Sequence, residues 1–287
     1  MMKRIKRGWA LSKKSWGLLN ENRELLRFPL YGAVATIPLA IVFLGPGLYL
    51  VADDVLAGGI PLLVIGVFVL SVVGFYFSVG LAAAADMIFR GEKATVSDGL
   101  AVARSRFTQI LGWAAVSTAI SVLMGVLEEY GGIAGTVAAR LVGMAWSLVT
   151  FISVPVIAIE GTGPLETLKR SGSLFRERWG QQITGNLAIG GAVLLLGVLP
   201  SVALGALGVV IWTSASFAGA LLLVVGVIGL AISFLVSKAL NGIFGVALYR
   251  YALDGEAVGG FTPEELESAV KPKGGRNAPP TATPGTV

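Results

Sequence analysis

Residues 60–82 read IPLLVIGVFVLSVVGFYFSVGLA and contain no charged side chain. An unbroken apolar segment of about 20 residues has the length at which an α-helix crosses the roughly 30 Å hydrocarbon core of a bilayer. The rest of the chain agrees, because only 14% of its 287 residues are charged, against about 25% in a typical soluble domain. Its mean hydropathy is +0.80. The sequence therefore predicts an all-α protein that spans a membrane.

Outward from this segment, the chain contains six apolar stretches separated by short charged loops. The expected spans are Leu30–Ala52, Ile60–Ala82, Ile110–Leu127, Leu141–Ala158, Ile183–Leu207 and Phe217–Val236. The second and sixth are expected to continue as helices, to Arg90 and to Tyr251. The expected fold class is an all-α polytopic transmembrane helical bundle. Its six spans form three hairpins, each preceded by a basic amphipathic helix.

By composition the chain divides into three parts. We expect a cytoplasmic basic amphipathic helix in residues 1–29 and the six-span transmembrane domain in residues 30–256. Residues 257–287 are expected to form a short acidic helix and a disordered tail, also cytoplasmic. Two helix starts carry the pattern of a capping box, Thr95-Val-Ser-Asp98 and Thr262-Pro-Glu-Glu265.

The distribution of basic residues predicts the orientation. Lys and Arg are concentrated before the first span and in alternate loops, whereas the opposite side has only Arg140, beside acidic residues such as Asp53 and Glu128. By the positive-inside rule, both termini lie in the cytoplasm of a multi-pass protein of the plasma or inner membrane. The net charge of +5 then indicates the lipid bilayer and anionic lipids of the cytoplasmic leaflet as partners. A membrane protein is a further expected partner, and nucleic acid is not expected.

The pattern of a basic helix followed by an apolar hairpin occurs three times. The copies open with LSKKSWGLLNENREL (residues 11–25), LAVARSRFTQILGW (residues 100–113) and LKRSGSLFRERWG (residues 168–180). The second and sixth spans also align at an offset of 160 residues, which places Arg90 on Arg250. Either a duplication or the chance alignment of apolar repeats explains this match.

Three stretches of the chain resemble an uncharacterised family of prokaryotic six-span integral membrane proteins, a domain of unknown function. They are WALSKKSW…NRELLRFP (residues 9–29), WSLVTFISVPVIAIEGTGPLETLKRS (residues 146–171) and FGVALYRYALDGE (residues 244–256). The resemblance implies a fold and no activity. More distantly, the helix-plus-hairpin pattern resembles bacterial membrane domains, some of which are linked to envelope maintenance.

The composition excludes several kinds of chemistry. The chain has no cysteine and no histidine, which removes disulfides, thiolate nucleophiles, Cys/His zinc sites and histidine bases. Gly161-x-Gly163 lacks the third glycine and the preceding strand of a phosphate-binding loop. We therefore expect no enzymatic activity, no cofactor and no metal site.

Ionisable groups inside a membrane are costly, and they mark candidate sites by default. The candidate ligand-binding residues form a polar cluster in the inner half of the bundle: Asp86, Glu160, Asn186, Lys238 and Asn241. Lys238 is expected to pair with Glu160 or Asp86 and to attract an anionic head group. The competing interpretation is a snorkelling lysine beside buried hydrogen bonds that fix helix packing. Pro155, within the fourth span, is expected to kink its helix.

Two classes of function stay open. The first is an accessory or structural role in the cell envelope, and the second is a transporter or binder of a lipid or small molecule through the polar cluster. A buried, paired Lys238 favours transport, whereas an interfacial Lys238 favours the accessory role. A lipid-modifying enzyme with Glu160 or Asp86 as its base is a third reading, which no catalytic constellation supports.

Overall fold

The computed structural model describes residues 14–179, 197–212 and 216–270, and every regular element in these ranges is a helix. Residues 14–21 are helical. The further elements are η1 (Arg23–Leu26), α2 (Arg27–Ala52), α3 (Leu56–Phe89), α4 (Val96–Ser105), α5 (Phe107–Tyr130), α6 (Gly132–Ile159), α7 (Pro164–Trp179), α9 (Leu199–Trp212), α10 (Ser216–Asp254) and α11 (Pro263–Val270). The all-α prediction is confirmed for these residues.

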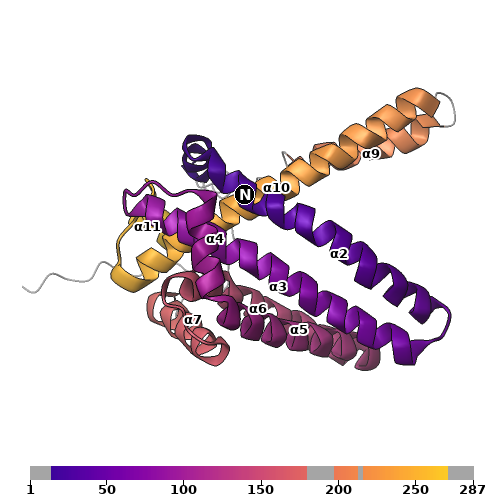
Figure 1. The fold of residues 1–287 in the computed structure, drawn as a ribbon, viewed down its shortest axis with the longest axis horizontal. Coiled ribbons are helices and arrows are strands. Elements are labelled where there is room, and N and C mark those ends of the chain that lie inside the picture. Colours follow the sequence, from indigo (N-terminus) through magenta and orange to yellow (C-terminus); the bar gives the residue numbers. More distant parts are fainter. Residues whose placement is uncertain (1–13, 180–196, 213–215, 271–287) are drawn as a thin grey trace, which may run out of the picture.

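Long helices extend from one end of the molecule, at which the shorter helices gather (Figure 1). We call the end that contains α4, α7 and α11 the packed end. The opposite end, at which α2 turns into α3 and α5 into α6, is the hairpin end. The α9–α10 pair diverges from the α2–α3 pair, and the two are joined where α10 runs back into the packed end (Figure 1).

Within the described ranges, four helices are long and apolar enough to cross a membrane: Arg23–Ala52, Leu56–Phe89, Phe107–Tyr130 and Phe217–Asp254. They contain the first, second, third and sixth of the expected spans. Two shorter apolar helical stretches, Thr150–Ile159 and Leu199–Trp212, overlap the other two. Part of the expected fifth span, residues 183–196, lies outside the described residues.

Glycines let the antiparallel helices of a pair approach closely. In the α9–α10 pair, a Cβ added to Gly208 would lie 2.8 Å from the carbonyl oxygen of Gly219, and one added to Gly219 would lie 2.8 Å from that of Gly208. In the α2–α3 pair, a Cβ on Gly66 would lie 2.7 Å from the Phe43 side chain. The contact of Gly208 with Gly219 is of the small-residue kind that is enriched where membrane helices associate.

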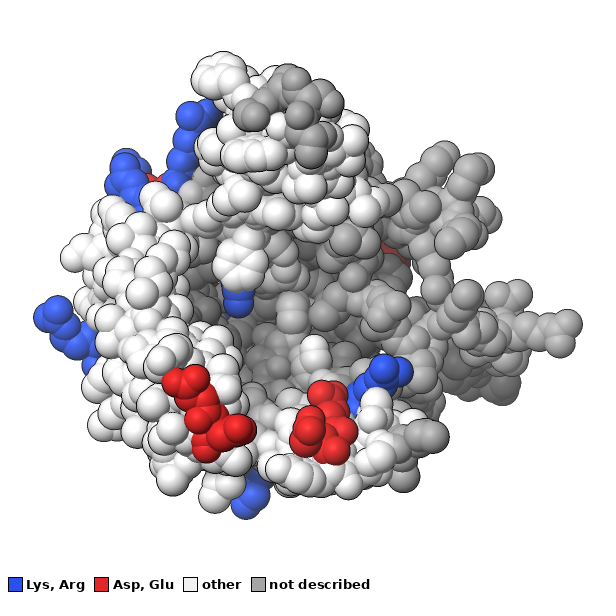
Figure 2. All heavy atoms as spheres, turned by 90° about the vertical axis from the view of Figure 1, so that its right-hand side faces the viewer, with Lys and Arg blue, Asp and Glu red and all other residues white. Residues whose placement is uncertain are grey.

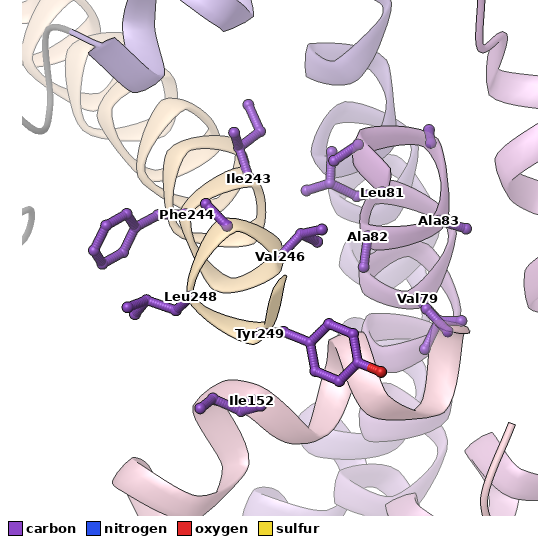
Figure 3. Close-up of a cluster of buried hydrophobic side chains, with 14 of the residues drawn as sticks. Val79, Leu81, Ala82, Ala83, Ile152, Ile243, Phe244, Val246, Leu248 and Tyr249 are labelled. Carbon is purple, nitrogen blue, oxygen red and sulfur yellow. The ribbon is translucent and has the colours of Figure 1, made fainter. Parts of the chain in front are cut away.

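The buried core lies at the packed end. Figure 3 shows α3 and α10 side by side there, with Leu81 and Ala82 near Val246 and with Tyr249 reaching toward α3 and α6. On α10, large apolar side chains are exposed from Phe217 to Phe234, whereas the helix is buried over most of its length after Lys238. The molecule therefore has an exposed apolar half and a packed half, as expected where lipid surrounds one of them.

Local capping fixes the short helices of the packed end. The Thr95 side chain accepts from the Asp98 N–H, and the Asp98 carboxylate accepts from the Thr95 N–H, which confirms the predicted capping box of α4. The Thr262 hydroxyl accepts from the Glu265 N–H and the Glu265 carboxylate from the Thr262 N–H, so α11 begins in the same way. Both patterns were recognisable because capping depends only on neighbouring residues.

Candidate functional site

The four candidate residues that the structure describes do not form one cluster. Asp86 and Glu160 lie at the packed end, in separate ion pairs. Lys238 and Asn241 line a cavity that lies further toward the N-terminus of α10. Asn186 lies outside the described residues.

Asp86, near the end of α3, is held by two arginines. Its side chain is only 6% exposed, and Oδ1 lies 2.6 Å from Nη2 of Arg250 and 2.7 Å from its Nε. Arg90, one turn along α3, contributes a longer contact of 3.3 Å to Oδ2. The two arginines that align at the 160-residue offset thus share one carboxylate. A buried carboxylate with such charge-assisted hydrogen bonds serves to fasten α10 to α3.

Glu160 directly follows α6 and is fastened in a similar way. Its carboxylate accepts hydrogen bonds from Nε of Arg170, at 3.0 and 3.2 Å, and from the Tyr249 hydroxyl, at 2.8 Å. The hydrogen bond to Glu160 favours the charged form of Arg170 and raises its pKa, and this effect outweighs the partial burial, which acts in the opposite direction. Tyr249 precedes Arg250, so two consecutive residues of α10 bind carboxylates from different parts of the chain.

The expected pairing of Lys238 with Glu160 or Asp86 is wrong. Lys238 is 11 residues from Tyr249 on α10, which corresponds to about 16 Å along a helix at 1.5 Å per residue. A lysine side chain cannot span that distance, and both carboxylates are already paired. Arg170, Tyr249 and Arg250 were missed as partners, although all three stand in the stretches that resemble the family. The sequence does not reveal which helix faces which.

Lys238 instead lines a cavity of about 720 Å³ between α2, α3, α6 and α10. The cavity wall is largely apolar and includes Ile37, Phe77, Phe151 and Leu235. Lys238 is the only charged side chain among the lining residues that the structure describes. Figure 2, viewed from the hairpin end, shows the molecule hollowed between its helices, with a basic side chain inside the recess.

The ammonium group of Lys238 has no carboxylate partner within the described ranges. It lies 5.6 Å from the centroid of the Phe234 ring, one turn earlier on α10, in a cation–π arrangement. Lys238 is exposed, not buried. The arrangement leaves the three ammonium protons available to an anion that enters the cavity.

Residues 57–260 match a family of unknown function, DUF6159. This region includes the Asp86 and Glu160 ion pairs and the part of α10 that carries Lys238. No curated protein matches the chain. Because the match spans well over half of the 287 residues, the resemblance to an uncharacterised family is confirmed, and the chain belongs to DUF6159, a family of unknown function.

Proposed function

We propose that this protein is an accessory membrane protein of the cell envelope that binds an anionic lipid in the cavity beside Lys238. The observation that carries the proposal is the position of Lys238 as the one charged side chain among the described residues of an apolar cavity wall. An apolar pocket with few polar groups is typical of a ligand site. The apolar lining would contact the acyl chain of a lipid, and the ammonium group of Lys238 would bind the lipid's phosphate.

The proposed topology has six spans, with both termini and the packed end in the cytoplasm. Basic residues support it, since Arg90, Arg104 and Arg170 belong to the packed end and acidic residues such as Asp53 and Glu129 to the hairpin end. The two spans beyond the four long apolar helices would be formed by α6 and by the segment that ends with α9. The membrane itself is inferred from composition and from positive-inside charge.

The expected depth of Lys238 agrees with a lipid head group. Exposed apolar side chains on α10 run from Phe217 to Phe234, which corresponds to about 26 Å at 1.5 Å per residue. This length nearly fills the roughly 30 Å hydrocarbon core. Lys238, one turn further, would lie at the level of the cytoplasmic head groups. A charged lysine costs little free energy there, and lipid phosphates are found at the same level.

Transport is the alternative, and the ion pairs weigh against it. Asp86 and Glu160, the carboxylates that an ion-coupled pathway would need, fasten α10 to α3 and to α6 and α7. Lys238 is exposed and unpaired within the described part of the chain, which favours an accessory role by the criterion set out above. The same ion pairs leave neither carboxylate available as a catalytic base, so we expect no enzymatic activity.

Native mass spectrometry tests the lipid site. The full chain is released from nanodiscs of phosphatidylcholine with phosphatidylglycerol, as wild type, Lys238→Ala and Lys93→Ala. Lys93 is an exposed lysine outside the cavity and serves as the matched control. We expect a retained phosphatidylglycerol in the wild type and in Lys93→Ala, and its loss in Lys238→Ala.

Equal retention by all three proteins would overturn the assignment of Lys238, and a wild type without bound lipid would overturn the lipid site itself. A polypeptide retained in place of lipid would support the accessory role through a protein partner and contradict the lipid site.

A further inference from the structure

The polar atoms of the cavity wall differ in what they offer a ligand. Besides Lys238, the lining contains the side chains of Thr36, Ser78, Thr150 and Asn241. The hydroxyl groups of the first three donate to carbonyl oxygens four residues earlier in their own helices, at 2.7, 2.8 and 2.8 Å. Each of these hydroxyl protons is engaged, and only oxygen lone pairs remain.

Asn241 adds an acceptor to the wall. Its amide nitrogen donates to the carbonyl and to the hydroxyl of Ser237, at 2.8 and 3.2 Å. A backbone carbonyl can only accept, so the nitrogen must be the atom that faces it, and this fixes the orientation of the amide. Oδ1 is left as an acceptor in the wall of the cavity.

Pro155 adds a further acceptor. A proline lacks the N–H that would bond the carbonyl of the residue four positions earlier, here Phe151. Phe151 also lines the cavity, and its carbonyl oxygen points toward α10, because a Cβ added to Gly245 would lie 3.5 Å from it. The predicted kink position thus leaves one carbonyl oxygen without its helical partner, beside the cavity residue Gly245.

These groups lie at similar heights on their helices. Lys238 and Thr150 are 11 and 10 residues from the Tyr249–Glu160 hydrogen bond, which is about 15–16 Å along α10 and α6. Asn241 and Ser78 are 9 and 8 residues from the Arg250–Asp86 ion pair, or about 12–14 Å along α10 and α3. The cation and these acceptors therefore lie at one level of the cavity wall, where a single head group would meet them.

Resting on the lipid site proposed above, we infer that the cavity selects an anionic lipid whose head group carries hydroxyl groups, such as a glycerol head group. Lys238 supplies the only cation among the described lining residues, while the three hydroxyl groups and Oδ1 of Asn241 offer acceptors. A head group with one phosphate and free hydroxyls satisfies both sets. Phosphatidic acid offers charge without glycerol hydroxyls, and an ethanolamine head group would place an ammonium beside Lys238.

Competition between two anionic lipids tests this selection. Nanodiscs contain equal amounts of phosphatidylglycerol and phosphatidic acid with identical acyl chains, in a phosphatidylcholine background. Charge alone would favour phosphatidic acid, whose phosphate carries at least as much negative charge. We expect the retained lipid in the wild type to be phosphatidylglycerol by about five-fold or more, the ratio that one additional net hydrogen bond produces.

Variants of the cavity wall test whether its hydrogen-bond acceptors cause the preference for phosphatidylglycerol. The Thr150→Val/Asn241→Leu double variant is expected to retain an anionic lipid but to lose the preference for phosphatidylglycerol. Thr136→Val is the matched control, because Thr136 on the same helix bonds its own backbone in the same way but does not line the cavity. We expect it to keep the wild-type ratio.

The outcomes separate the two proposals. Equal retention of both lipids by the wild type, with loss of both in Lys238→Ala, would overturn the hydroxyl selection and leave the lipid site standing. Retention of neither lipid would remove the lipid site. A wild-type preference that the double variant keeps would contradict the role of Thr150 and Asn241.

Discussion

The guanidinium of Arg250 lies 2.6 Å from the carboxylate of Asp86, although the two residues are 164 positions apart in the sequence. The residue before it, Tyr249, binds Glu160 at 2.8 Å. α10 is therefore anchored on two sides at the packed end, and its segment from Leu230 to Gly245 forms one wall of the cavity. Asp86 and Glu160 position the walls of the site and are not among its lining residues.

Replacing Asp86 by Asn tests this anchoring. The change leaves two arginines without their carboxylate at a side chain that is 6% exposed, and loss of one partner of a buried ion pair typically costs about 3 kcal/mol. We expect a clearly lower free energy of unfolding in detergent. Glu92→Gln is the control, because Glu92 contacts Arg90 with half of its side chain exposed and should change stability little. A similar small effect of both variants would contradict the anchoring role.

Gly99→Ala tests the contact between α3 and α4. A Cβ on Gly99 would overlap the carbonyl oxygen of Gly80 and lie 2.6 Å from the ring of Phe28, which is fully buried. Overpacking of this kind costs about 1–3 kcal/mol, so thermal unfolding should shift to a lower temperature. Gly172→Ala in α7 is the control, since a Cβ there has nothing within 4 Å, and it should be neutral or stabilising. Wild-type stability of Gly99→Ala would show that the helices can separate freely.

The ion pair between Lys14 and Glu265 is expected to make stability depend on pH. Burial alone raises the pKa of Glu265, but hydrogen bonds from Lys14 and from the Thr262 backbone outweigh it and hold the pKa below its ordinary value of 4.5. Since the folded pKa is the lower one, the stabilisation is complete above about pH 4.5 and is lost as the pH falls through the folded pKa.

Unfolding of the wild type and of Glu265→Gln should be compared between pH 7 and pH 3. We expect the wild type to be more stable by about 1 kcal/mol at pH 7, a modest value because both side chains are partly exposed. The difference should shrink as the pH falls below 4.5. A constant difference across this range would show that the Glu265 charge does not contribute.

The absence of cysteine in the chain allows a direct test of the proposed topology. Single cysteines are introduced at Ser97, which is exposed at the packed end, and at Glu129, which is exposed at the hairpin end. A membrane-impermeant maleimide added to intact cells should label only Glu129→Cys, and both should react after lysis. Labelling of Ser97→Cys in intact cells would reverse the orientation.

Much of the local structure followed from the sequence. The predicted extensions of the second and sixth spans agree with α3, which ends at Phe89, and with α10, which continues to Asp254. The third span was expected from Ile110 to Leu127, and α5 exceeds it by three residues at each end. Apolar length and capping patterns depend on neighbouring residues only, so they can be recognised without knowing which helices pack together.

The site was predicted less well. Lys238 and Asn241 do share a cavity wall, but the expected partners of Lys238 lie about 16 Å further along the bundle and bind Tyr249, Arg170 and Arg250. Choosing among several basic residues for each carboxylate requires the rotation and the register of every helix. These depend on close glycine contacts, such as that of Gly208 with Gly219. The sequence alone does not show which of the 39 glycines make such contacts.

By itself, the sequence determined which segments become long apolar helices, where the short capped helices begin, and which chemistry is excluded by the lack of cysteine and histidine. These properties follow from the composition and the order of neighbouring residues. Only the tertiary structure decided that Asp86 and Glu160 fasten α10, that Lys238 remains without a carboxylate in the described part of the chain, and that a cavity opens beside it. Those outcomes depend on helix packing, because an ion pair or a cavity exists only where distant segments are brought to a defined distance.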